Sequence, residues 1–233
     1  MNVKRVYNNG NDTYSLADYI CIALLLGAIW GFFEVFFKDV LSMGGKPYTA
    51  AVMTGIGVAF MAAAYGFFRK SGVVMAVAVF SIFARMIVVP VLGCSPMCRA
   101  NAVVALFLLG SFMALSMEVS SRVVKNNFKT GGLWVGGGVL LSGISFYYGG
   151  MACAPCQYLQ NFQQSGGLVS FLRVEVMYWV LFSAILYYPG YLAGTHLRNS
   201  MNTLRARRPV PYYAGIVCAS FLILIATGFM LLP

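Results

Sequence analysis

LADYICIALLLGAIWGFFEVFF, residues 16–37, is the stretch that decides the fold class. It is almost wholly apolar and is long enough to cross, as a helix, a hydrocarbon core of roughly 30 Å. Similar blocks recur to the end of the chain, which is 60% hydrophobic and 9% charged, with a mean hydropathy of +0.79. A soluble domain usually carries roughly 25% charged residues, so a water-soluble globule is excluded. Because lipid forces each crossing segment to satisfy its own backbone hydrogen bonds, the sequence predicts an all-α integral membrane protein.

The apolar blocks predict a bundle of about seven transmembrane helices, forming a single transmembrane domain over residues 1–233. The predicted spans are about 16–37, 48–68, 73–93, 102–119, 132–152, 168–196 and 212–232. Lys and Arg indicate the orientation, because cytoplasmic loops carry an excess of them. With the N-terminus inside, 11 of the 16 fall in inner segments and 3 in outer loops. The sequence therefore predicts a multi-pass protein of the cytoplasmic (inner) membrane, with its N-terminus cytoplasmic and its C-terminus extracytoplasmic. The lipid bilayer is its first partner, and the scattered basic residues give no indication of nucleic acid.

Small residues recur at every fourth position of the first predicted span, at Ala23, Gly27 and Gly31. Such a face lets two helix backbones approach closely in lipid. Two interpretations follow from this pattern. The face packs inside the protein's own bundle, or it is a docking face for a partner membrane protein.

Four charged residues fall within the predicted spans, in their outer halves: Glu34, Arg85, Arg173 and Glu175. Charges in the bilayer are costly, so these side chains are expected to face the bundle interior or a water-filled cavity. One interpretation is a set of structural ion pairs that hold helices together. The other is a polar pocket, open to the outside, that binds a small substrate.

Four of the six cysteines form two short-spaced pairs, Cys94 with Cys98 and Cys153 with Cys156, both on the predicted outer side. Three interpretations stay open: structural disulfides, a shared thiolate site for zinc, copper or an iron–sulfur cluster, and a redox-active Cys-x-Pro-Cys motif. For the first two, we expect the pairs to lie close together on the outer face. The chain has no plausible Ser/His/Asp set and no phosphate-cradling loop, so no catalytic residue is predicted.

The stretch from Ala23 to Glu118 resembles the substrate-binding subunits of energy-coupling factor transporters. The features that carry the resemblance are the small-residue first span, Gly31-Phe32-Phe33-Glu34, the short loop into Pro47, Gly55-Ile56-Gly57, the turn Arg69-Lys70-Ser71-Gly72 and the helix with Arg85. The resemblance implies a transport subunit that binds a vitamin-like molecule or a metal in an outward-facing pocket. It also implies that Ala23, Gly27 and Gly31 dock a coupling protein, which works with paired ATPases. The alternative from the cysteines is a membrane thiol–disulfide or cysteine-metal-site protein, or an accessory subunit of a larger membrane complex.

Overall fold

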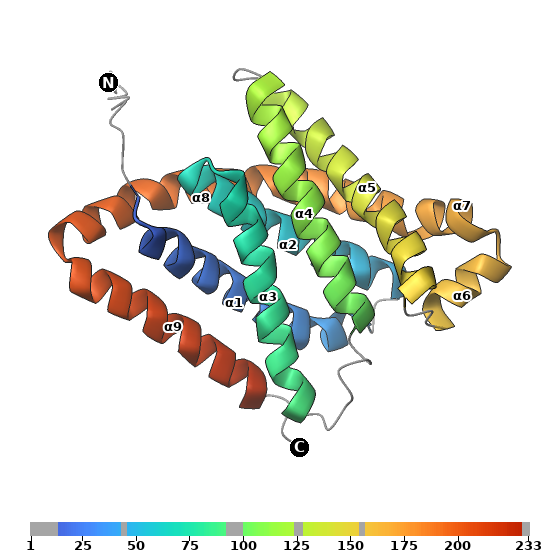
Figure 1. The fold of residues 1–233 in the computed structure, drawn as a ribbon, viewed down its shortest axis with the longest axis horizontal. Helices are drawn as coiled ribbons and strands as arrows, with labels where there is room; N and C mark the ends of the chain where they lie inside the picture. Colours follow the sequence, from blue (N-terminus) through green and yellow to red (C-terminus); the bar gives the residue numbers. More distant parts are fainter. Residues whose placement is uncertain (1–13, 43–45, 92–99, 124–127, 154–156, 230–233) are drawn as a thin grey trace.

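A computed structural model of the chain describes residues 14–42, 46–91, 100–123, 128–153 and 157–229. Within these ranges the regular elements are helices, as Figure 1 shows. In chain order they are α1 (Leu16–Ser42), α2 (Lys46–Phe68), α3 (Ser71–Val91), α4 (Ala100–Val123), α5 (Phe128–Cys153), α6 (Gln157–Gln164), α7 (Gly167–Phe171), a π-helical turn η2 (Leu172–Val176), α8 (Met177–Arg207) and α9 (Pro209–Phe229). The predicted all-α fold is confirmed.

Five helical stretches of the described chain are long and apolar enough to cross a bilayer. They are Leu16–Phe37, Tyr48–Phe68, Ala100–Ser120, Gly167–Arg207 and Pro209–Phe229. Among the fully described residues, α3 adds a further apolar stretch, Ser71–Ile87. The 26 residues of α5 are enough for a crossing, but its glycines and tyrosines lower its mean hydropathy. An integral membrane protein is confirmed, whereas the count of seven spans and the sides of the termini stay predictions.

The most extensive helix contact in the described chain joins α2 and α8, which run parallel. Gly55 of α2 lies against Phe182 of α8, and further along both helices Gly194 of α8 lies against Ala63 of α2. A Cβ added at Gly194 would overlap the α2 backbone, so glycine is what permits this close approach. Close backbone contact of this kind holds helices together where lipid offers no hydrophobic driving force.

The remaining long helices pack around this pair. In Figure 1, α8 crosses the molecule, and α9 returns from its end alongside α1. On its other faces α1 packs on α2 and α3, while α4 joins α3 to α5, and α5 closes back onto α8. As a result α1 is covered by three neighbours, and its side chains supply much of the buried core.

The region after α5 differs from the prediction in two ways. The segment between the fifth and sixth predicted spans contains a helix, α6, whose polar sequence QYLQNFQQ buries Leu159 completely. The predicted span 168–196 is composed of α7, η2 and α8, and α8 continues to Arg207. Hydropathy missed both features because α6 and the end of α8 are polar, although their residues are compatible with helix. Gly166 and Gly167 make the turn into α7 with φ of 122° and 66°, values that favour glycine.

Candidate functional site

Two acidic residues of α1 are buried, and each is ion-paired with an arginine of another helix. Near one end of α1, Glu34 Oε2 accepts a hydrogen bond of 2.9 Å from Arg85 Nη1 of α3. Both side chains are about nine-tenths buried, with 9% and 10% exposed. Isolated charges in a bilayer cost at least ~2.5 kcal/mol each, so the pairing is what allows this pair to be buried.

The small residues of α1 set the distance at which Glu34 and Arg85 meet. A Cβ on Gly27 would lie 2.5 Å from the Cβ of Phe80 and 2.8 Å from the carbonyl oxygen of Val77. A Cβ on Gly31 would overlap that of Ala84, the residue before Arg85. The glycines therefore let α3 lie directly on α1, which brings the guanidinium within bonding distance of the carboxylate.

The same face bears on the predicted docking role of the small residues. Ala23 is fully buried, and Gly27 and Gly31 are covered by α3 of the same chain. The structure thus shows these residues in packing within the bundle. The docking role of these residues stays a prediction.

Two further buried polar atoms lie one helical turn before the members of the ion pair. Trp30 precedes Glu34 by four residues, and Ser81 precedes Arg85 by four; both are fully buried. Trp30 Nε1 and Ser81 Oγ have no hydrogen-bond partner among the residues that the structure describes. Buried polar groups normally have a hydrogen-bond partner. Trp30 and Ser81 therefore add two unsatisfied polar atoms to the buried surroundings of α1, next to the ion pair.

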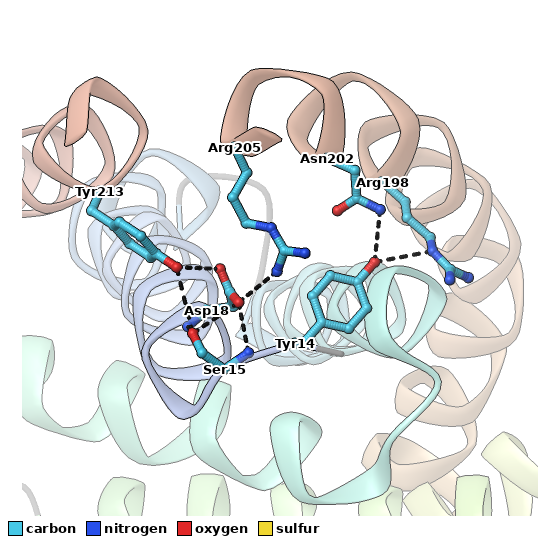
Figure 2. Close-up of polar contacts among 7 residues, drawn as sticks. All are labelled: Tyr14, Ser15, Asp18, Arg198, Asn202, Arg205 and Tyr213. Carbon is cyan, nitrogen blue, oxygen red and sulfur yellow. Dashed lines mark hydrogen bonds and ion pairs between the residues drawn. The ribbon is translucent and has the colours of Figure 1, made fainter. Parts of the chain in front are cut away.

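At the other end of α1, Asp18 is the centre of a polar network, drawn in Figure 2. It begins as a helix cap: Ser15 N donates to Asp18 Oδ2 at 2.8 Å, and Asp18 N donates to Ser15 Oγ at 3.3 Å. A carboxylate in the first turn also suits the positive end of the helix dipole. The cap places a buried carboxylate, 1% exposed, at the start of the first apolar stretch.

The capped carboxylate ties α1 to the last two helices (Figure 2). Arg205, near the end of α8, donates to Asp18 Oδ2 at 2.6 Å, and Tyr213 of α9 donates to Oδ1 at 2.9 Å. Beside them the hydroxyl of Tyr14 accepts hydrogen bonds from Arg198 Nε at 3.1 Å and Asn202 Nδ2 at 2.9 Å. These contacts fix the long polar end of α8 against the start of α1.

The predicted cluster of four outer charges is only partly assembled. Glu34 and Arg85 meet, but Glu175 lies in η2, where Trp179 Nε1 donates to its Oε2 at 3.3 Å. Arg173, two residues earlier, is exposed and makes no hydrogen bond or ion pair with another described residue. Positions two apart on a helix point in different directions, which separates Arg173 from Glu175. The substrate-binding role of all four residues stays an untested prediction.

The predicted metal or disulfide site lies largely outside the described residues, since Cys94, Cys98 and Cys156 belong to undescribed segments and only the backbone of Cys153 is described. The helix ends that flank the two segments are adjacent, because Asn101 Oδ1 lies 3.7 Å from where a Cβ on Gly150 would be. Among the described residues no group of His, Cys, Asp or Glu suits a metal ion. Nothing in the described chain therefore supports a metal site or a disulfide.

A model of the MotA/TolQ/ExbB proton channel family matches residues 12–90. The chain is similar to that family over α1, α2 and α3. The match covers about a third of the chain and includes Asp18, Glu34 and Arg85. No curated protein and no solved structure matches the chain.

This match overturns the resemblance to substrate-binding subunits of energy-coupling factor transporters, which rested on residues 23–118. Small residues at every fourth position, and glycines and prolines between spans, occur in membrane helices of many kinds and therefore misled the comparison. The predicted substrate-binding transport function was wrong, and the thiol–disulfide or cysteine-metal alternative has no support. The coupling protein and ATPases that the resemblance implied are unsupported as well. The predicted multi-pass location in the inner membrane is confirmed.

Sequence reasoning also missed residues of the two polar sites. The spacing of Ser15 and Asp18 before an apolar run is a helix-start signal that could have revealed the cap. Nothing in the sequence indicates that Arg205 and Tyr213, nearly 200 positions later, meet that carboxylate. Tyr158 of α6, a neighbour of Glu175, was missed because α6 itself was not predicted.

Proposed function

We propose that this protein is a membrane-embedded subunit of a proton-driven, energy-transducing complex, and that it works with another membrane protein. The observation that carries the proposal is the buried Glu34–Arg85 ion pair, which lies in the helices that match the MotA/TolQ/ExbB proton channel family. Ionisable residues inside membrane helices usually mark paths of ions or protons.

Protonation of Glu34 would change the packing of α1 on α3. When Glu34 takes up a proton, its attraction for Arg85 is lost and a positive charge is left buried between α1 and α3. Because these helices are in close backbone contact at Gly31, the charge is relieved only if the helices shift or an anion approaches. Proton binding is thereby coupled to movement at the α1–α3 interface.

A second feature supports a need for a partner. Between Glu34 and Asp18 the α1–α3 interface is closely packed at Gly27 and Gly31. Asp18 and Glu34 are 16 residues apart, which is about 24 Å along a helix. A proton therefore has no open route along this interface between the two carboxylates. We infer that the route is completed by a second membrane protein or opens when the helices move.

The experiment is proton flux through the complex as it exists in the membrane. The tagged protein is purified with its bound partners from its own host membranes and reconstituted in vesicles that contain a pH-sensitive dye. A potassium diffusion potential then drives proton uptake. We expect uptake above that of empty vesicles, and at least a tenfold loss in Glu34→Gln.

The matched control is Glu118→Gln. Glu118 is a half-buried acid of α4 that accepts a hydrogen bond of 2.8 Å from Ser71 and lies outside the matched residues. Wild-type flux in this control, with loss in Glu34→Gln, supports the proposal. Uptake equal to that of empty vesicles in the wild-type complex, or equal uptake in wild type and Glu34→Gln, would refute it.

A further inference from the structure

Glu175 is a buried acid of a different kind from those of α1. It is 3% exposed, and its hydrogen-bond donors are neutral: the indole of Trp179 at 3.3 Å and the hydroxyl of Tyr158. Among the described residues no arginine or lysine pairs with it, whereas Asp18 and Glu34 each have an arginine. An ionised carboxylate buried with neutral partners is costly, so Glu175 is suited to carry a proton or to receive a small cation.

The hydrogen-bond donors to Glu175 belong to a buried aromatic cluster. The ring of Phe171, fully buried, lies 5.3–6.4 Å from five other aromatic rings, those of Phe146, Tyr147, Tyr158, Phe162 and Trp179. Leu159 and Val176 are also fully buried. Trp179 and Tyr158, the two hydrogen-bond donors to the Glu175 carboxyl, are part of this aromatic cluster. A metal ion needs several ligands, and no such group gathers among the described residues, whereas a proton needs the carboxylate alone.

The backbone at Glu175 is itself unusual. Residues Leu172–Val176 form a π-helical turn between α7 and α8. Such a turn inserts a residue into a helix and is found frequently at functional sites. Here it joins α8 to the short helices α6 and α7, which pack at the end of α5 (Figure 1). The acid thus lies near the start of the apolar stretch Gly167–Arg207, beside the polar helix α6.

Tyr158 connects the buried acid to the surface of the protein. It lies on α6 and is 38% exposed, yet its hydroxyl hydrogen-bonds to the carboxyl of Glu175. We propose that Glu175 is a proton-binding residue that exchanges its proton with water at this end of the bundle through the Tyr158 hydroxyl. In the uptake step, a hydronium ion gives a proton to the Tyr158 oxygen as the original hydroxyl proton moves to the carboxylate. Water, an intact tyrosine and a neutral carboxyl group result, and charge is conserved.

The other titratable side chains described near this site do not supply a counter-charge. They are Tyr147 and Tyr148 on α5, Tyr48 on α2, and Arg173 and Tyr178 on the same helical segment as Glu175. Arg173 is the cation among them, and it is exposed two positions away, where it faces a different direction. Proton exchange at Glu175 is therefore governed by Tyr158 and by the aqueous phase that Tyr158 reaches.

The test is infrared difference spectroscopy of the purified full-length protein after a pH jump. A carboxyl group that changes its protonation gives a carbonyl band in the difference spectrum. Among the carbonyl bands of wild type, we expect one that is lost in Glu175→Gln and retained in both Glu34→Gln and Glu118→Gln. Glu175→Asp, which keeps the carboxyl group, is expected to retain a shifted band, so that loss of the fold is not mistaken for loss of the site.

The role of Tyr158 has its own readout in the same experiment. Tyr158→Phe is expected to slow the appearance of the band at least tenfold, whereas Tyr148→Phe, at a side chain 60% exposed on α5, leaves the rate unchanged. The proposal is overturned if no carbonyl band is lost in Glu175→Gln, or if the band appears at the same rate in Tyr158→Phe as in wild type. The measurement needs no proton flux, so its failure would leave the proposed role of Glu34 to be decided by the flux experiment.

Discussion

The Glu34–Arg85 pair gives a double-mutant prediction whose magnitude can be worked out from its geometry. Its nitrogen and oxygen atoms are 2.9 Å apart, and about 10% of each side chain is exposed. Charge centres about 4 Å apart attract by about 4 kcal/mol at an effective dielectric constant of about 20. Glu34→Gln removes this attraction and leaves Arg85 buried without a counter-charge, which we expect to cost about 3–5 kcal/mol. Arg85→Gln is expected to cost a similar amount.

The double variant Glu34→Gln with Arg85→Gln shows whether the two unfolding costs are coupled or simply add. With both charges gone, two amides of similar size occupy the site, so the total cost is expected to stay below about 3 kcal/mol. The coupling free energy between the two positions is then at least about 3 kcal/mol. The assay is reversible unfolding in mixed detergent micelles, followed by circular dichroism, with Glu118→Gln as the control. A coupling below about 0.5 kcal/mol, the value of an exposed pair, would refute the reasoning.

Three further predictions concern α1 and its neighbours. Gly31→Leu forces α3 away from α1 and should cost at least about 1–3 kcal/mol in the same unfolding assay, whereas Gly215→Leu, which meets nothing within 4 Å, should cost less than about 1 kcal/mol. Asp18→Asn removes the charge that Arg205 and Tyr213 share, and should increase protease cleavage near the end of α8 several-fold; an unchanged cleavage rate would contradict this. Tyr213→Phe removes one hydrogen bond to a carboxylate and should cost about 1.5–3 kcal/mol, to be checked by the midpoint of thermal unfolding.

The membrane character of the fold could be predicted from sequence because it depends on composition and on segment length. Residues 16–37 alone meet the length requirement, and the helix α1 begins and continues where that apolar stretch indicates. The bounds of α6 and the end of α8 could not be predicted in this way. Their residues are polar, and what stabilises them is contact with distant segments, such as the burial of Leu159 and the bonds of Arg198 and Arg205 to the start of α1.

The candidate site shows the same division. The cost of burying charge in lipid singled out four residues, of which Glu34, Arg85 and Glu175 are buried and Arg173 is exposed. Which of them pair depends on helix neighbours and on rotation about each helix axis, and neither is encoded in local spacing. Arg85, for example, hydrogen-bonds to Glu34, whereas Glu175 accepts a hydrogen bond from Trp179 four residues later in the chain. The family resemblance failed for a related reason, since small-residue spacing reports how closely helices pack and not what the protein does.

We propose above that Glu34 takes up a proton, loses its ion pair with Arg85 and thereby couples proton binding to movement of α1 against α3. The most direct test of this proposal is proton flux in the reconstituted native complex, compared among wild type, Glu34→Gln, and a charge-swapped variant with Glu34→Arg and Arg85→Glu. We expect loss of flux in Glu34→Gln and measurable recovery in the charge-swapped variant, which restores an acid and its pair between α1 and α3. Wild-type flux in Glu34→Gln would contradict the proposal.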